Sequence, residues 1–303
     1  MSHSCSAKRL NRTALTLLEL VVVLGILAVL STVAVRSLEP IADQARYELT
    51  QTVLKDLRFA VAGESKRVSS SDSAIYSSFI TDTGVLPADV NALLVQPIAL
   101  SSQTIQSFDS DRDSVNDVTL ASGWNGPYLH LGPGVNEVLD GWGREPTLVE
   151  SSGDLDIISL GSDGDSIAAE DGYRADLSVS VLTRDYTGDI VFRLYAIDSL
   201  NGSRIDPNPT GTEQLAVLFY GVNAAGGSTG SVAEQTLVVP NSGSFEYRRA
   251  DTICGRVAAR AIHWDDADSD DVLDVGETVL KQSFVHYPVV HPAADVRIEM
   301  ELR

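Results

Sequence analysis

The chain has 303 residues, a formal net charge of −20 and 44% hydrophobic residues. A charge this negative repels nucleic acid and anionic lipid, which excludes both as partners of the acidic body. The length suffices for one large domain or two ordinary ones beyond an N-terminal helix.

An apolar stretch from Leu15 to Val35 follows a basic leader with Lys8, Arg9 and Arg12. As a helix this stretch would rise about 31 Å, which is enough to cross a bilayer. Its one acidic residue is Glu19, and a carboxylate within such a span costs roughly 2.5 to 3.5 kcal/mol on insertion scales. The stretch therefore predicts a transmembrane helix in which Glu19 needs a charged partner, with the basic leader on the cytoplasmic side.

Helical periodicity continues beyond the apolar stretch, over residues 41–65. Apolar residues recur there at three- and four-residue spacing, namely Ala45, Leu49, Val53, Leu57, Ala60 and Val61. Pro40 removes one intrahelical hydrogen bond and is expected to kink or loosen the helix. We therefore expect residues 15–65 to form one long transmembrane and spine helix that leads into a globular body.

Four short motifs follow one another in the next part of the chain. They are Thr81 to Pro87, Gly123 to Leu129, Asp140 to Pro146 and Asp154 to Gly164. Trp124, Tyr128 and Trp142 can anchor a small core, and the glycines permit the tight turns that short strands require. These motifs predict a globular domain over residues 66–176.

Residues 177–303 alternate strand-like segments with turns rich in Gly, Pro, Asn and Ser. The expected strands are Leu177 to Val181, Asp189 to Ile197, Gln214 to Tyr220, Gln235 to Val239, Arg256 to Trp264, Thr278 to Val285 and Val296 to Leu302. Short strands in such a series predict an antiparallel β-sandwich.

Two acidic clusters have the spacing of metal-binding loops. Residues 266–277 follow the pattern of an EF-hand loop, in which Asp271 stands where Gly is usual. The candidate calcium ligands in this loop are Asp266, Asp268, Asp270, Asp274 and Glu277. The second cluster contains Asp109, Asp111, Asp113 and Asp117. It lacks Gly at the sixth position and has Leu120 at the twelfth, so a hydrated loop is the default interpretation there.

The segment from Ala14 to Leu27 resembles the class III signal of type IV prepilins and type II secretion pseudopilins. That resemblance implies that a prepilin peptidase cuts between Ala14 and Leu15, which stand where the family usually has Gly and Phe, and that Leu15 is then N-methylated. Glu19 would be the fifth mature residue and would neutralise the N-terminal amine of a neighbouring subunit during assembly. Removal of the leader, residues 1–14, also removes Cys5 and leaves Cys254 without a disulfide partner. A plain signal anchor is the alternative interpretation of this segment.

The four motifs, in their order, resemble the body of the major pseudopilin of type II secretion systems. That body carries a Gly-Pro-Tyr-Leu element, an Asp-Pro-Trp-Gly turn and a Ser-Leu-Gly-Ala-Asp-Gly loop. In this chain Gly141 stands in place of the proline of the turn, and Ser162 stands in place of the alanine of the loop. The family's last loop binds calcium. The resemblance implies calcium ligands at Leu160, Asp163, Asp165, Glu170 and Asp171. Ordinary major pseudopilins end near this loop, so residues 177–303 are an extension.

The expected fold is α+β, with a long N-terminal transmembrane and spine helix packed on a small antiparallel sheet as in pilins, followed by a β-sandwich domain. The resemblance implies a structural subunit of a type II secretion filament that helps to export proteins across the outer membrane. Its location would be the inner membrane, as a single-pass protein with a periplasmic body that enters a periplasmic filament. The expected partners are further copies of the chain, minor pseudopilins, prepilin peptidase and the inner-membrane assembly platform, with calcium as the bound ion.

Two alternatives remain open from the sequence. One is a minor or adhesive type IV pilin whose C-terminal β domain binds a partner. The other is a membrane-anchored binding protein that never polymerises and keeps its leader. Catalysis is not expected, because the chain has no HExxH pattern, phosphate loop or GxSxG elbow.

Overall fold

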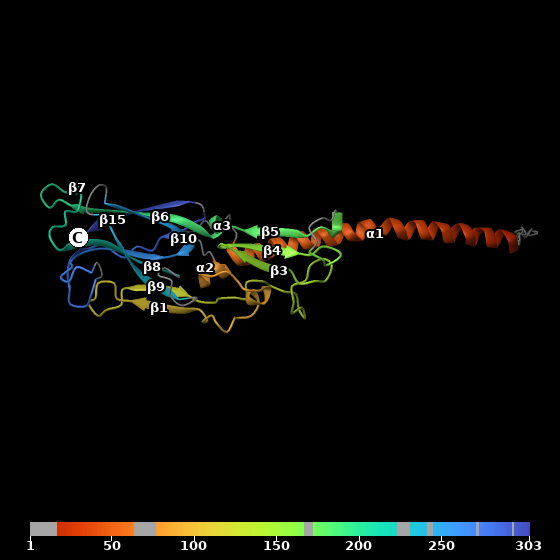
Figure 1. Cartoon of the computed structure of the whole chain (residues 1–303), viewed down its shortest axis with the longest axis horizontal. Helices are drawn as coiled ribbons and strands as arrows, with labels where there is room; N and C mark the ends of the chain where they lie inside the picture. Colours follow the sequence, from red (N-terminus) through yellow and green to blue (C-terminus); the bar gives the residue numbers. More distant parts are fainter. Residues whose placement is uncertain are drawn as a thin grey trace, which may run out of the picture.

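A computed structural model describes residues 17–63, 77–166, 172–222, 231–240, 245–270, 273–292 and 294–303, with the backbone alone at 33–38 and 174. The expected cleavage site at Ala14 and Leu15, and the expected calcium ligands Glu170 and Asp171, lie outside the described residues. Figure 1 shows an elongated molecule with a helix at one end and stacked sheets at the other.

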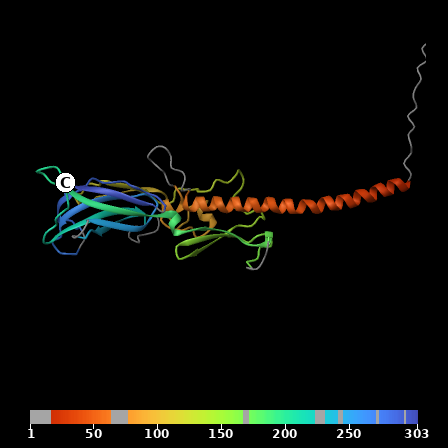
Figure 2. The same cartoon turned by 90° about the horizontal axis from the view of Figure 1, so that it is seen from above.

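The helix α1 (Leu17–Ala62) has 46 residues and continues through Pro40. Its first half extends away from the body with a gentle curve (Figure 2). Its second half enters the body, where Leu54, Leu57 and Val61 are buried. Leu49, which the periodicity placed on the core face, is 53% exposed although its neighbour Thr50 is fully buried, because the body covers a different face of the helix at this level.

A three-stranded antiparallel sheet packs on the second half of α1. Its order is β3-β4-β5. The strands are β3 (Thr147–Ser151), β4 (Asp154–Ser159) and β5 (Leu177–Val181). Leu155, Ile157 and Val181 meet the buried helix residues in one apolar core. The short helices α2 (Phe79–Thr83), η1 (Val90–Leu93), η2 (Gly172–Arg174) and α3 (Thr183–Tyr186) lie in the connections.

Two larger sheets form a sandwich beyond α3. The first has the order β10-β6-β15, with β7 beside β6, and the second the order β13-β12-β8-β9. Their strands are β6 (Thr187–Ile197), β7 (Arg204–Ile205), β8 (Glu213–Val222), β9 (Val232–Val238), β10 (Glu246–Ile253), β12 (Ala258–Asp265), β13 (Thr278–Gln282) and β15 (Asp295–Leu302). A small pair, β11 (Gly255–Arg256) and β14 (Val289–Val290), lies beside them. Phe192, Phe219 and Met300 belong to the core between the sheets.

A hairpin from the middle of the chain covers the outer face of the second sheet. It consists of β1 (Thr104–Phe108) and β2 (Val118–Ser122). Val118 and Leu120 pack there with Tyr220, Ile262 and Trp264. The central strands β8 and β12 of the second sheet are therefore buried on both faces. Residues 104–122 thus contribute to the core of the C-terminal part of the chain. The boundary expected at residue 177 stays a prediction.

The α+β class expected from the sequence is wrong. The described residues are mostly β, with fifteen strands in five sheets. The expected sandwich is also not purely antiparallel, because β15 pairs with β6 in parallel. The physical reason is that strands of residues 104–122 pack into the same apolar core as strands of the C-terminal part. Most of the buried apolar residues of the body therefore lie between sheets, and fewer lie between a helix and a sheet.

The sequence also predicted a transmembrane helix and a single-pass location in the inner membrane, and the structure contradicts both predictions. Among the described residues, no helix combines the length and the apolar character that a membrane crossing requires.

Candidate functional site: assembly helix and acidic loops

The projecting half of α1 exposes a large apolar surface, which we call the assembly helix (residues 17–32). Leu17 is 82% exposed, and most of the leucines, valines and isoleucines that follow are exposed too. The hydroxyls of Ser31 and Thr32 donate to the carbonyls of Leu27 and Ala28, four residues earlier, so they add little polarity to the surface. An exposed apolar surface of this extent is typical of a binding interface.

Glu19 lies exposed in the first turn of α1. A carboxylate at this position interacts favourably with the positive end of the helix dipole. It is also the one acidic residue of the assembly helix. If other helices packed around it, its charge would need a cationic partner, because a buried unpaired carboxylate is costly.

The Asp140 to Pro146 motif attaches the body to α1. The side chain of the buried Asp140 accepts hydrogen bonds from the backbone N–H groups of Trp142 and Arg144, each at 2.9 Å, and from the hydroxyl of Ser159 at 2.7 Å. The N–H of Gly141 donates to the hydroxyl of Thr50 on α1 at 2.9 Å. The motif therefore acts as a brace between the helix and β4.

The Gly123 to Leu129 motif packs on α2 and η1. The indole N–H of Trp124 donates to the carbonyl of Ala92 at 3.0 Å, and the Trp124 and Tyr128 rings meet edge to face at 5.9 Å. The hydroxyl of Tyr128 donates to the carboxylate of Asp82 at 3.0 Å. Burial is the main cause that raises the pKa of Asp82 to about 6, despite hydrogen bonds from Ser77 and Tyr128 that lower it. This motif thus has a structural role in the core around α1.

The loop at residues 160–165 is held by an arginine. The guanidinium of Arg144 donates to the carbonyls of Gly161, at 2.5 Å, and Ser162, at 3.2 Å. Asp163 and Asp165 are exposed, and no metal-binding group among the described residues contains them. The carbonyl of Leu160 accepts the N–H of Gly164 at 3.0 Å. Calcium binding by this loop stays a prediction, since two of its five expected ligands lie outside the described residues.

The EF-hand-like loop joins β12 to β13, between Asp265 and Thr278. Asp266, Asp268 and Asp270 each offer an oxygen within 4.8 Å of the others. Glu277 closes the loop, because its carboxylate accepts the N–H groups of Ala267 and Asp274, both at 2.9 Å. The structure thus brings three of the five expected ligands together. Asp274 is not part of the group, and Glu277 binds the loop's backbone.

The electrostatics of this loop favour a cation. Asp266 is buried, whereas Asp268 and Asp270 are exposed. Partial desolvation and the charges of Asp270, Glu277 and Asp266 raise the pKa of Asp268. A bound cation would relieve this repulsion, and closely spaced carboxylates are the oxygen ligands that calcium prefers.

The second acidic cluster is more ordered than the sequence suggested. Asp109, Asp111 and Asp113 also offer oxygens within 4.8 Å of one another. Asp117 is not part of this group, because it forms an ion pair with Arg260 of β12 and accepts hydrogen bonds from Ser110. The sequence carries no local signal for that ion pair, since its two residues lie 143 positions apart.

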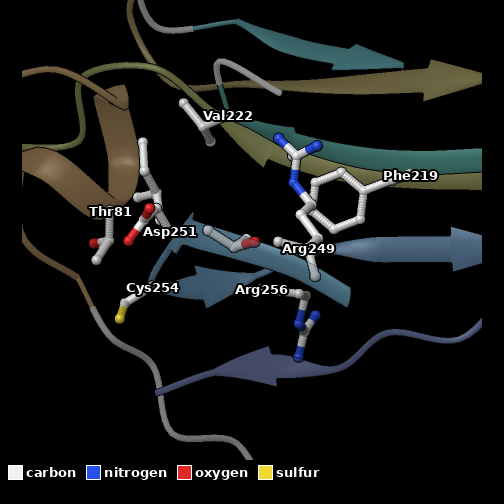
Figure 3. A pocket seen from close by; sticks show the side chains of 11 residues that line it. Thr81, Phe219, Val222, Arg249, Asp251, Cys254 and Arg256 are labelled. Carbon is white, nitrogen blue, oxygen red and sulfur yellow. The ribbon is translucent and has the colours of Figure 1, made fainter. Parts of the chain in front are cut away.

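A small pocket lies where α2 approaches the sandwich (Figure 3). Arg249 stacks on the ring of Phe219, with 4.5 Å between the guanidinium carbon and the ring centre, and burial lowers its pKa. Figure 3 shows the guanidinium groups of Arg249 and Arg256 pointing in different directions. The pocket has a volume of about 90 Å³, too small for a typical organic ligand. We assign it no function.

No protein-family model, no curated protein and no solved structure matches the chain. The likeness to pseudopilins therefore depends on the residues and motifs of the chain itself.

Proposed function

We propose that the chain is a pilin-like structural subunit that assembles with further copies into a filament of the type II secretion pseudopilin class. The observation that carries this proposal is the assembly helix, whose apolar side chains are exposed over about four helical turns. Each square ångström of apolar surface removed from water contributes roughly 25 cal/mol. Parallel packing of this helix against the same helix in neighbouring copies would bury that surface.

The arrangement of the body supports the same function. The assembly helix and the sandwich lie at opposite ends of the molecule (Figure 1), so helices can gather in a filament core while the sandwiches face outward. The brace formed by Asp140 and Gly141 joins α1 to the sheet that covers it. Force on the helix would therefore reach the body through this brace.

Glu19 has a defined role in this proposal. Cleavage between Ala14 and Leu15 would place a new amine four residues before Glu19 in the chain. Among packed helices, the carboxylate of Glu19 would pair with that amine in a neighbouring copy. The pairing would fix the register between subunits, because a mispaired copy would bury two uncompensated charges.

We also propose that the EF-hand-like loop binds calcium. Asp266, Asp268 and Asp270 supply the oxygens, and Glu277 holds the two arms of the loop together. Calcium there would stiffen the end of the sandwich farthest from α1 (Figure 1). No catalytic role is proposed for the chain.

A second candidate function, that of a minor or adhesive pilin, is favoured by the exposed apolar residues of the distal loops. Leu200, between β6 and β7, is 93% exposed, and Val275 of the EF-hand-like loop is 87% exposed. Both loops lie at the end opposite to α1 (Figure 1). A partner that binds this end would leave the assembly helix free to attach the subunit to a filament.

The experiment that tests the proposed function compares Glu19→Gln with Glu39→Gln in cells that supply prepilin peptidase and an assembly system. Glu39 is a matched control, because it is an exposed glutamate of the same helix that lies outside the assembly helix. We expect Glu19→Gln to reduce the sheared filament fraction at least tenfold and Glu39→Gln to leave it unchanged. Mass spectrometry should find chains that begin at methylated Leu15. Equal filament yields for both variants would contradict the role of Glu19, and an intact leader would contradict assembly.

A further inference from the structure

The three-stranded sheet beside α1 has two free edges. Its order is β3-β4-β5, so β3 and β5 each pair with β4 alone among the described strands. Four of the five residues of β3 are exposed, and so are Ser178 and Ser180 of β5. A strand at the edge of a sheet carries N–H and C=O groups that can pair with a strand of another chain. Both edges of this sheet are therefore candidate contact surfaces.

A hydrogen bond from α1 shows which backbone groups of β5 face its free edge. Arg58 Nε donates to the carbonyl of Ser180 at 3.2 Å, so Ser180 faces away from β4. In an antiparallel pair, two opposite residues face either toward or away from each other, and the two kinds alternate along the strands. Ser178 of β5 therefore also faces outward, and so do Leu148 and Glu150 of β3.

The two free edges are compatible in direction. Both β3 and β5 are antiparallel to β4, so they run in the same direction. The strands of this sheet run roughly along α1 in both views, so its free edges face sideways (Figure 1 and Figure 2). Copies whose helices pack in parallel also lie side by side. The β3 edge of one copy can therefore meet the β5 edge of the next, as a parallel pair.

The register of the sheet suits such a pair. Val149 and Ser180 lie in one row across the sheet, through Asp156 of β4. If the next copy continued this row, its Val149 would lie opposite Ser180. In a parallel pair the bonds slant to the two neighbours of the opposite residue. The N–H and C=O of Ser180 would then meet Leu148 and Glu150, which are the two outward-facing residues of β3.

The charges near the β5 edge also favour this contact. A groove of about 520 Å³ lies between α1 and β5. It is lined by three cations, Lys55, Arg58 and Arg184, and by one anion, Asp185, although the chain has a net charge of −20. Arg58 forms an ion pair with Asp185 at 2.9 Å. Lys55 and Arg184 are exposed, and neither pairs with a carboxylate of the described residues. The groove therefore suits an acidic partner.

Glu150 provides the opposite charge at the β3 edge. It is exposed, and its side chain forms no ion pair or hydrogen bond with the described residues. It lies in one row with Leu155 and Val181, and residues in one row point to the same face of a sheet. Val181 is buried in the core that includes α1, so Glu150 points to the face that α1 covers. Lys55 and Arg58 of the next copy would lie on that face.

We propose that the free edge of β3 in one copy docks on the free edge of β5 in the next, with Glu150 in the groove beside Lys55. A continuous sheet would then run through neighbouring subunits. The contact is heterologous, because it joins two different surfaces, and heterologous contacts that do not close into a ring extend into filaments. The docking rests on the proposed filament function and specifies how neighbouring bodies contact each other.

A charge exchange tests the pairing in cells that supply prepilin peptidase and an assembly system. Lys55→Glu and Glu150→Lys should each reduce the sheared filament fraction at least fivefold, because each brings like charges together. The double variant should recover at least half of the original yield. Lys281→Glu is the matched control, an exposed lysine of β13, and should leave the yield unchanged. An unchanged yield for either single variant, or no recovery in the double variant, would overturn the pairing.

Cysteine crosslinking separates this contact from the filament itself. Val149→Cys with Ser180→Cys, in a Cys5→Ser, Cys254→Ala background, should form ladders of disulfide-linked chains, because opposite residues of paired strands lie within disulfide reach. Val149→Cys alone should form no ladder, because the contact joins different edges. Crosslinks through Leu24→Cys in the assembly helix without ladders from the pair would overturn the docking and leave the filament intact. Absence of both would overturn the docking together with the proposed function.

Discussion

Gly141 lies directly against the backbone of Arg46 on α1. A Cβ atom at position 141 would lie 2.0 Å from the carbonyl oxygen of Arg46, which no side chain permits. The N–H of Gly141 also donates to the hydroxyl of Thr50, one turn further along the same helix. Glycine at this position therefore lets the brace contact α1 closely enough to form a hydrogen bond.

Gly141→Ala should destabilise the body. The added methyl group must push the brace away from α1, and overpacking of this kind typically costs about 1 to 3 kcal/mol. The free energy of unfolding from urea titration measures the effect. Gly132→Ala is the control, because a Cβ at position 132 would meet no atom within 4 Å. Equal stability of the two variants would show that the contact is unimportant.

Stability should rise on acidification through the pKa of Asp82. Burial raises that pKa to about 6 in the folded chain, above its ordinary value of 3.8. The folded state thus holds a proton more tightly than the unfolded state, so the free energy of unfolding falls as the pH rises from about 3.8 to about 6 and stays at the lower value above that pH. A shift of this size corresponds to about 2 to 3 kcal/mol.

The measurement compares the free energy of unfolding of the unaltered chain and Asp82→Asn between pH 4 and pH 7.5. The difference between them should change across this range, because asparagine does not titrate. Asp198→Asn, in an exposed turn, should follow the unaltered chain. A constant difference between Asp82→Asn and the unaltered chain would contradict the prediction.

Cys254 should react slowly with thiol reagents in the folded chain. It is buried and lines the small pocket of Figure 3, and burial raises the pKa of its thiol to about 12. Almost no thiolate is then present at pH 8, and the thiolate is the reactive form. Labelling of a Cys5→Ser variant, followed by mass spectrometry, should be at least a hundredfold slower without urea than in urea. Similar rates would mean that the sandwich opens readily.

Calcium should raise the melting temperature of the full chain, and chelation should lower it. Binding to the folded state alone contributes about 2.7 kcal/mol at a calcium concentration one hundred times the Kd. Asp268→Asn should lose most of the calcium effect, because it removes a charge from the EF-hand-like loop without removing a backbone contact that holds the loop closed. Asp163→Asn is the comparison variant, because Asp163 is an expected calcium ligand of the other loop, residues 160–165, which Arg144 holds in place. A calcium response that survives Asp268→Asn and disappears in Asp163→Asn would assign the effect to residues 160–165.

The parts of the structure that local sequence patterns could predict are those that depend on short-range contacts. The spacing of Asp266, Asp268 and Asp270 predicted three converging carboxylates, and the group forms where β12 ends. The alternation of apolar residues also located several strands, such as β5 from Leu177 to Val181. Such patterns show which side chains lie on the same face of a strand or loop, and that depends only on residues close together in the sequence.

The remainder depends on pairings between distant residues. The strand β10 was missed because its sequence, from Glu246 to Ile253, is polar and its burial is slight. The parallel pairing of β15 with β6 joins Val296 to Ile190, and the buried Arg260 meets Asp117 across a similarly large separation. No local pattern encodes such contacts, which is why the mostly β class and the position of β1 and β2 were not anticipated.

The central claim is that the assembly helix packs against the same helix in other copies. Cysteine crosslinking tests it most directly, with Leu24→Cys in a Cys5→Ser, Cys254→Ala background and with Leu200→Cys as the control at the distal end. Both native residues are exposed. Oxidation in cells that supply the assembly system should yield crosslinked dimers at position 24 and few at position 200. Leu24→Cys chains that stay monomeric while the control crosslinks would contradict the account.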